Sequence, residues 1–365
     1  MSTFLSSHDD IVAFFGCTPI LYATIRITGL CNLYCKHCYA NASSHVDVSD
    51  EFDTNEMFQL LDELRELGVG RLSISGGEPF CRKDVYDILH RASDLGFDIY
   101  LSTNGTNNIS VEKLSGCNIK VLQVSIDGLA KMHDEIRGEK GAFFRAVQFL
   151  KKMADCNTTT TGVAFSLMRQ NINEALPLFR YLHDNELANV FSVIPVQKLG
   201  RAEQSDMLSA KELKSTLETL ADYYLCSNRT VELNIMAPPA IVPTSLKNTK
   251  YSKGYVCEFP YSIAIDTKGN CAICDGLLNL REFINANIRE DKKYYEHLFS
   301  SETSRKWLDT SPASLKGICQ KCCFLDLCSG GCRVDSYLNT GDFHTSDPLC
   351  QRYYDSGIFP EEYLV

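Results

Sequence analysis

Residues 31–38 read Cys-Asn-Leu-Tyr-Cys-Lys-His-Cys, which places Cys31, Cys35 and Cys38 on one loop with C-x3-C-x2-C spacing. Three thiolates so close together can hold three irons of a cubane iron–sulfur cluster. The fourth iron then has no protein ligand and is open to a substrate or cofactor. Zinc is the alternative, but a structural zinc site takes four protein ligands. His37, next to Cys38, cannot easily join the same tetrahedron.

Short β-branched runs alternate with amphipathic stretches around this loop, from residue 20 to about residue 200. The runs have the length of buried parallel strands and cover residues 22–27, 71–75, 98–102, 121–126, 163–168 and 190–196. Residues 57–67 have helical apolar spacing, and Asp53 and Thr54 before them are helix-capping types. Six strand–helix alternations predict an α/β fold with a parallel sheet and outer helices. Periodicity alone leaves an open sheet and a partial barrel both possible.

Glycines and polar residues follow three of the predicted strands. They are Gly76, Gly77, Glu78 and Pro79 after the second strand, Ser102 and Asn104 after the third, and Ser125 and Asp127 after the fourth. Parallel sheets place their active sites at the carboxyl ends of the strands. Glycine lets a backbone approach a ligand closely, and the Glu78 carboxylate can accept a hydrogen bond from an ammonium group. The strand ends therefore predict a ligand site beside the cysteine loop.

Most of the other cysteines gather near the C-terminus. Nine of the 17 lie between Cys257 and Cys350, and five stand singly elsewhere, where a buried small apolar role is the usual one. The ordered set is Cys257, Gly269 and Cys274, then Cys319, Cys322, Cys328 and Cys332, and finally Cys350. A double zinc ribbon is the alternative for this set. The segment has little apolar periodicity, which predicts a fold that metal stabilises.

The N-terminal motifs resemble the radical S-adenosylmethionine (SAM) superfamily over about residues 20–200, and the C-terminal cysteines resemble the SPASM domain of one of its subgroups. The resemblance implies a partial (β/α)6 TIM-like barrel followed by a small Cys-rich iron–sulfur domain. It assigns a 4Fe–4S cluster to Cys31, Cys35 and Cys38, with SAM on the open iron. The implied SAM-binding set is His37 at the adenine, Gly76, Gly77, Glu78 and Pro79 at the amino group, Ser102 and Asn104 nearby, Ser125 and Asp127 at the ribose, and Arg137 at the carboxylate.

The same resemblance implies two auxiliary 4Fe–4S clusters. The outer one would use Cys319, Cys322, Cys328 and Cys350, and the inner one Cys257, Cys274 and Cys332. Some relatives have a further cysteine before the first, where this chain has Tyr251 and Lys253. The inner cluster would then have an open iron or borrow Cys271; Cys323 is the less suited substitute.

Asp275 directly follows Cys274. In the similar sulfatase-maturating enzymes, an aspartate at a like position acts as a base, and a carboxylate near a cluster is able to accept a proton. An aspartate that caps the turn in Cys-Asp-Gly is the alternative. Asp275 is therefore the candidate catalytic residue, and the sequence leaves both roles open, as a base or as a turn cap.

The implied reaction is hydrogen abstraction after reductive cleavage of SAM. Similar enzymes mostly crosslink, oxidise or epimerise ribosomally made peptides, and another branch modifies porphyrins; residues 196–202 resemble a stretch common to both. We expect a peptide substrate. A porphyrin or another small molecule is the alternative substrate, and an electron-transfer iron–sulfur protein is the non-enzymatic alternative. The cysteine loop begins too early for a leader-binding domain before it. Three alternatives follow: a separate leader-binding protein as partner, recognition of the substrate by the barrel itself, or a substrate that is not a leader-bearing peptide. A flavodoxin or ferredoxin is the expected reductant.

Composition and charge narrow the setting. The 365 residues carry a formal net charge of −10, which disfavours binding to nucleic acid or anionic membranes. No apolar run approaches the roughly 20 residues of a membrane-spanning helix, and the N-terminus lacks signal-peptide features. We expect a cytoplasmic enzyme. The expected organisation is an N-terminal segment (1–19), the barrel (20–203), a bridging helix and extended linker (204–256), and the auxiliary-cluster domain (257–365).

Overall fold

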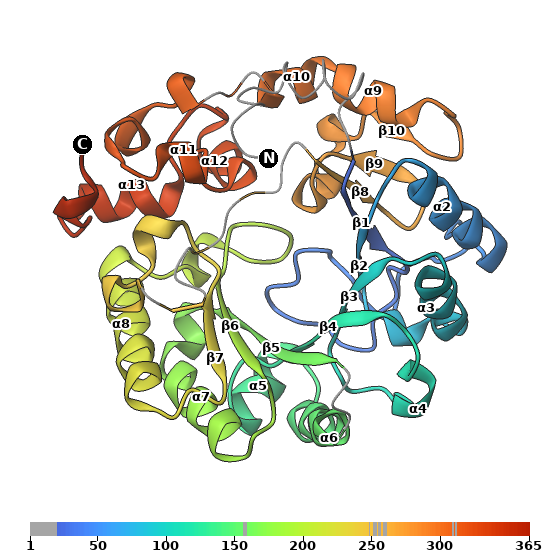
Figure 1. Ribbon diagram of the computed structural model, residues 1–365, viewed down its shortest axis with the longest axis horizontal. Coiled ribbons are helices and arrows are strands. Elements are labelled where there is room, and N and C mark those ends of the chain that lie inside the picture. Colours follow the sequence, from blue (N-terminus) through green and yellow to red (C-terminus); the bar gives the residue numbers. More distant parts are fainter. Residues whose placement is uncertain are drawn as a thin grey trace.

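The computed structural model describes residues 20–155, 159–247, 249–250, 254, 257, 261–308, 310 and 312–365, and one curved sheet runs through them (Figure 1). The strands lie in the order β10-β9-β8-β1-β2-β3-β4-β5-β6-β7. Their bounds are β1 (Tyr22–Arg26), β2 (Arg71–Ser75), β3 (Asp98–Thr103), β4 (Ile119–Ser125), β5 (Thr160–Leu167), β6 (Val190–Pro195), β7 (Glu232–Ile235), β8 (Ser262–Ile265), β9 (Asn270–Ala272) and β10 (Ala286–Asn287). Strands β8 and β1 to β7 all pair in parallel with their neighbours in this series. Strand β9 pairs antiparallel with β8, and β10 pairs antiparallel with β9.

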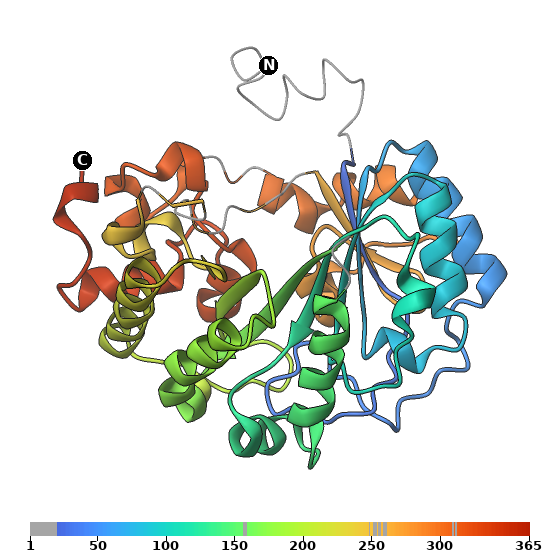
Figure 2. The ribbon, with the colours of Figure 1, turned by 60° about the horizontal axis from the view of Figure 1, so that its bottom comes forward.

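The helices after the strands cover the outer face of the sheet, and the C-terminal helices lie across the side where the curve stays open (Figures 1 and 2). The outer helices are α2 (Thr54–Glu66), α3 (Val85–Asp94), α4 (Val111–Leu114), α5 (Ala130–Arg137), α6 (Ala142–Ala154), α7 (Ala175–Asp184) and α8 (Ala210–Cys226). The C-terminal helices are α9 (Tyr294–Ser300), α10 (Glu302–Leu308), α11 (Leu325–Cys328), α12 (Arg333–Thr340) and α13 (Pro348–Asp355). The architecture is the predicted α/β partial barrel.

Local sequence accounts for where two of the long helices begin. Asp53 caps α2 in a reciprocal capping box with Glu56, and Ser209 caps α8 in the same way with Glu212. Each box satisfies two backbone N–H groups that the first helical turn leaves unpaired. The apolar stripe of α2, which includes Met57, is buried against the sheet. The predicted start of the helix after Asp53 is confirmed, and the second box marks the start of the expected bridging helix.

The sheet extends beyond the six predicted strands. All six are present, but β7 follows β6, and β8 pairs with β1 on the other side. Residues 262–265 therefore belong to the barrel sheet, although they follow the expected domain boundary at residue 257, and the division of the chain into domains stays a prediction. None of the described helices is long and apolar enough to cross a membrane.

The chain after β7, in the second part of the segment 204–256 where we expect an extended linker, is not extended where the structure describes it. Pro239–Ile241 and Thr244–Leu246 form 3-10 turns, and Ala240, Ile241 and Val242 are buried in the main core. The apolar side chains explain the packing, because leaving them exposed would forgo their burial free energy. Residues 248, 251–253 and 255–256, including Tyr251 and Lys253, lie outside the described residues.

Candidate active site

The cysteine loop follows β1 and is fastened to the end of α5. Backbone N–H groups of Tyr34 and Lys36 donate to carbonyls in α5, at 3.2 and 3.0 Å. Cys31 and Cys35 are 8% and 7% exposed, and the cysteine thiols that the structure describes are free. The Sγ atom of Cys35 accepts a contact from Arg137 Nη1 at 3.6 Å. The loop thus presents buried, unbridged thiols, which suits ligation of iron.

The segment after β6 holds this loop from the other side. Arg201 donates from Nε to the Cys35 carbonyl at 2.8 Å and from Nη1 to the Ala42 carbonyl at 2.9 Å. Its guanidinium also lies 4.1 Å from the centre of the Tyr34 ring. Gly200 has φ +65, and a Cβ atom there would collide with the Cys38 carbonyl oxygen. Residues 196–202 stand out in the sequence only by resemblance, and no sequence pattern predicts their contact with the cysteine loop.

Replacing Gly200 by alanine is expected to empty the cysteine loop of iron. The new Cβ would meet the Cys38 backbone, which cannot move without displacing that ligand. We expect iron analysis after anaerobic reconstitution to show a loss of about four irons per chain, the content of one 4Fe–4S cluster. The matched control is Gly68→Ala, because Gly68 has φ +90 with no atom near its Cβ position. Equal iron in Gly200→Ala and Gly68→Ala would contradict the prediction.

A cavity of about 340 Å³, which we call the first cavity, lies where the cysteine loop meets the strand ends. All three loop cysteines line it, together with the predicted residues His37, Gly76, Gly77, Glu78, Ser102, Asn104, Ser125 and Arg137. Pro79 and Asp127 do not line it; Pro79 begins a short 3-10 turn behind Glu78. Within the residues that the structure describes, no three His, Cys, Asp or Glu side chains converge closely enough to hold a single metal ion. The three loop cysteines share the lining of one cavity, which suits ligation of a multi-iron cluster.

The Gly-Gly-Glu-Pro turn joins the second and third strand ends to the loop. Gly76 has φ +138, and a Cβ at Gly76 or Gly77 would collide with backbone carbonyls of residues 28–30. The Glu78 carboxylate accepts from Thr103 Oγ1 at 2.7 Å and from the Asn104 N–H at 2.6 Å. Burial raises the pKa of Glu78 to about 7. Both oxygens of Glu78 thus have protein partners, which gives this residue a structural role besides any contact with a ligand.

A buried ion pair joins Arg137, which lines the cavity, to Asp127. Arg137 Nε is 2.7 Å from Asp127 Oδ2, and the two side chains are 9% and 0% exposed. His37 Nε2 lies 3.5 Å from the same oxygen. Burial acts to raise the pKa of Asp127, but the Arg137 charge and further partners together hold it below its usual value. Asp127 therefore positions Arg137, whose guanidinium reaches both the cavity and the Cys35 thiol.

Replacing Arg137 by methionine is expected to destabilise the fold by about 3–5 kcal/mol, because it leaves the Asp127 carboxylate buried without its partner. The double variant Asp127→Asn, Arg137→Met removes that charge and should recover a large part of the loss. Chemical unfolding of both variants beside the wild type measures the difference. If the double variant were no more stable than the single one, the ion pair would not account for the effect.

The outer cysteine site, defined by Cys319, Cys322, Cys328 and Cys350, is assembled in the structure. The four residues line one small enclosed cavity between α11 and α13. Apolar side chains, including Ile318, Phe324 and Phe359, form much of the remaining wall. Four thiols in a dry, enclosed space suit a fully ligated cluster.

The inner cysteine site, defined by Cys257, Cys274 and Cys332, borders a second cavity of about 320 Å³, which we call the chamber. Cys274 and Cys332 line the chamber. Burial, and then the neighbouring thiols of Cys257 and Cys332, raise the pKa of Cys274. The chamber shares four lining residues with the first cavity, namely His37, Tyr39, Ser166 and Ile194. The two cavities therefore adjoin, with the cysteine loop on one side and the inner cysteine site on the other.

Cys271 is the expected substitute ligand of the inner cysteine site, and that assignment stays a prediction. It lies in β9, where it is fully buried in the main core, and its thiol donates to the Gly269 carbonyl at 3.4 Å. Its strand pairs with β8 and β10, and the chamber lining does not include it. Cys271 lies inside β9, whereas Cys274 lies beyond the end of that strand.

Asp275 lies beside Cys274 and binds the end of β1. Its Oδ1 atom accepts from Arg26 Nε at 2.7 Å, and its carbonyl accepts from Arg26 Nη2 at 2.8 Å. Arg26 also donates to Asn279 Oδ1 at 2.9 Å. The side chain of Asp275 is 20% exposed. The residue thus ties the cysteine-rich segment to the barrel, and a catalytic role stays a prediction.

Comparisons with known proteins agree with this geometry. The Radical SAM superfamily model matches residues 25–182. An AdoMet-dependent heme synthase of Methanosarcina barkeri is 30% identical, over 89% of this chain and 94% of that protein. A mycofactocin maturase of Mycolicibacterium smegmatis is 27% identical, over 90% and 81%.

Among solved structures, Streptococcus suis SuiB bound to S-adenosylmethionine has the same fold. It superimposes with a TM-score of 0.70 at 18% identity, over 92% of this chain and 78% of that one. The fold, the cysteine loop at the strand ends and these relatives all agree on the family. The chain belongs to the radical SAM superfamily, and it is an enzyme that uses SAM and an iron–sulfur cluster.

Proposed function

We propose that this radical SAM enzyme abstracts a hydrogen atom from a ribosomally made peptide that lies in the chamber. The observation that carries the proposal is the adjoining pair of cavities, one at the cysteine loop and one at the inner cysteine site. When bound at the loop, a 4Fe–4S cluster and SAM supply a 5′-deoxyadenosyl radical. His37 and Tyr39 line both cavities and stand at their junction. A substrate in the chamber would therefore meet the SAM cavity across these two side chains.

Each cysteine set has a proposed occupant. Cys31, Cys35 and Cys38 would hold the SAM-binding 4Fe–4S cluster, and the outer and inner cysteine sites would hold two auxiliary 4Fe–4S clusters. The residues lining the first cavity would bind SAM, with the Arg137 guanidinium available to its carboxylate. Because Cys271 lies elsewhere, the inner cluster would have an iron without a protein ligand. Cys274 and Cys332 line the chamber, where a substrate sulfur would be a suitable further ligand.

The chamber wall favours a peptide. Apolar side chains dominate it, with Ile194, Val196, Leu199, Met236, Val334 and Leu349 among them. Among the described residues that line it, none is Lys or Arg. A porphyrin with several carboxylates would have to desolvate those charges without a cationic partner, which is costly. An apolar or sulfur-containing peptide side chain carries no such cost.

A tetrapyrrole is the second candidate, and a specific observation favours it. Several similar proteins carry tetrapyrrole names, including the Fe-coproporphyrin III synthase of Methanosarcina barkeri, which is 26% identical over 89% of this chain and 86% of that protein. Under either substrate, we propose a cytoplasmic enzyme that receives electrons from a flavodoxin or ferredoxin. For a peptide, a separate leader-binding protein is a proposed partner.

Filling the chamber tests the proposal. Leu199 is half-buried in the loop after β6 and lines the chamber, so Leu199→Trp places an indole in the substrate space. We expect 5′-deoxyadenosine formation without substrate to persist and its stimulation by peptide to fall at least tenfold. The matched control is Lys198→Trp, because Lys198 is the exposed neighbour. The probes are a synthetic library of Cys-containing peptides and, separately, iron coproporphyrin III. Stimulation by the porphyrin alone would favour the second candidate, and unchanged peptide stimulation in Leu199→Trp would contradict the chamber assignment.

A further inference from the structure

Asp347 lies between the outer and inner cysteine sites. It is the N-cap residue of α13 and is 2% exposed. It lines the enclosed cavity of the outer cysteine site and also the chamber that borders the inner one. No motif in the sequence singled it out.

Its carboxylate joins one cysteine of each site. Oδ1 accepts from the backbone N–H groups of Leu349 and Cys350, at 2.9 and 3.3 Å. Oδ2 accepts from the backbone N–H of Cys332 at 3.1 Å. Cys350 belongs to the outer site and Cys332 to the inner one, so one side chain fixes the backbone spacing of both.

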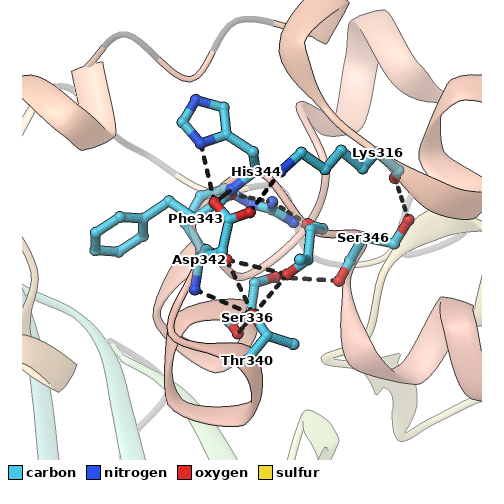
Figure 3. Close-up of polar contacts among 9 residues, drawn as sticks. Lys316, Ser336, Thr340, Asp342, Phe343, His344 and Ser346 are labelled. Carbon is cyan, nitrogen blue, oxygen red and sulfur yellow. Dashed lines mark hydrogen bonds and ion pairs between the residues drawn. The ribbon is translucent and has the colours of Figure 1, made fainter.

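The surrounding chain leaves this carboxylate little freedom. Gly331 has φ +73, and a Cβ there would collide with Asp347 Oδ2. Figure 3 shows the loop before Asp347 held against α12 and Lys316 by polar side chains. The Lys316 ammonium lies 2.8 Å from Asp342 Oδ2, and Ser346 Oγ donates to the Lys316 carbonyl at 2.5 Å. Ser346 Oγ also accepts from the Cys319 N–H at 3.1 Å, which ties the loop to the outer cysteine site.

We propose that Asp347 is a positioning residue that couples the two auxiliary clusters. It sets the spacing of Cys332 and Cys350 and places a carboxylate charge between the clusters. A nearby negative charge disfavours reduction, and cluster potential depends on net charge and hydrogen bonding around the ligands. Asp347 therefore holds both reduction potentials lower than the cysteines alone would. This inference rests on the proposed function, because both cysteine sites must hold iron.

Asp347→Asn tests the coupling, since asparagine caps helices about as well as aspartate. A residue that only capped α13 would leave the clusters unchanged. The coupling role predicts that both auxiliary midpoint potentials become more positive and that the electron paramagnetic resonance spectrum of the inner cluster changes. Iron content should match the wild type, whereas thermal stability should fall modestly, because the asparagine NH2 group cannot accept from the Cys332 N–H as Asp347 Oδ2 does. The control is Asp53→Asn, which alters the cap of α2, far from both cysteine sites in the chain.

A second variant approaches the same oxygen from outside. Gly331→Ala should displace Asp347 Oδ2 and shift the inner-cluster potential in the same direction, whereas Gly341→Ala, at φ +74 in open space, should not. Unchanged potentials and spectra in Asp347→Asn would overturn the inference and leave the proposed function intact. Wild-type protein with iron at the cysteine loop alone would overturn both.

Discussion

Replacing Cys35 by alanine is expected to abolish 5′-deoxyadenosine formation while both auxiliary clusters remain. Cys35 is buried, lines the first cavity and receives the Arg137 contact, so its thiol cannot be replaced by a neighbour. Anaerobically reconstituted wild type should contain about 12 irons per chain and the variant about 8, since each cluster holds four. Iron analysis and liquid chromatography of the nucleoside product measure both effects.

The matched control for this variant is Cys271→Ala. Cys271 is also buried, but it lies in β9 and packs in the main core. We expect its iron content and its 5′-deoxyadenosine yield to equal those of the wild type. A loss of iron in Cys271→Ala would restore it as a ligand, and 5′-deoxyadenosine formation in Cys35→Ala would contradict the assignment of the loop.

Replacing Asp275 by asparagine is expected to preserve 5′-deoxyadenosine formation and to lower the yield of modified product about 10²–10⁴-fold, the usual contribution of a general base. The amide has the same shape but cannot take a proton from the substrate. Product is measured by mass spectrometry of the peptide that stimulates the wild type most.

Arg26→Gln separates a proton-accepting role from a structural one. It breaks the same 2.7 Å ion pair and keeps the Asp275 carboxylate. If Asp275 is the base, Arg26→Gln should retain far more product than Asp275→Asn. Equal losses in the two variants would show that the ion pair between β1 and the cysteine-rich segment is what matters, and unchanged product in Asp275→Asn would return the residue to a turn.

The sequence predicted much of the barrel because its signals are local. The apolar runs of the six strands are long enough to stand out, and the capping boxes at Asp53 and Ser209 mark helix starts exactly where the structure has them. The polar residues at the strand ends come together because parallel strands all end at one edge. Eight of the ten predicted SAM-binding residues line the first cavity, and six of the eight lie at or just after strand ends.

What the sequence did not predict depends on contacts between distant segments. Strands β7 and β8 have four residues each, too few for a periodic signal, and β8 exists by pairing with β1. Cys271 lies inside β9 and Cys274 lies beyond its end. The spacing of the two cysteines in the sequence does not predict this difference. Arg201 and Asp347 act through backbone groups of residues elsewhere in the chain, and no spacing rule predicts such contacts.

The most direct test of the central claim is the isotope content of 5′-deoxyadenosine. Anaerobically reduced wild-type enzyme is incubated with SAM and a fully deuterated version of the peptide that stimulates it most, and the nucleoside is analysed by mass spectrometry. If the peptide lies in the chamber and loses a hydrogen atom there, 5′-deoxyadenosine should gain one deuterium in the wild type and in Lys198→Trp, but not in Leu199→Trp. This claim would be contradicted by 5′-deoxyadenosine that stays unlabelled with every peptide, or that gains deuterium only from a deuterated porphyrin.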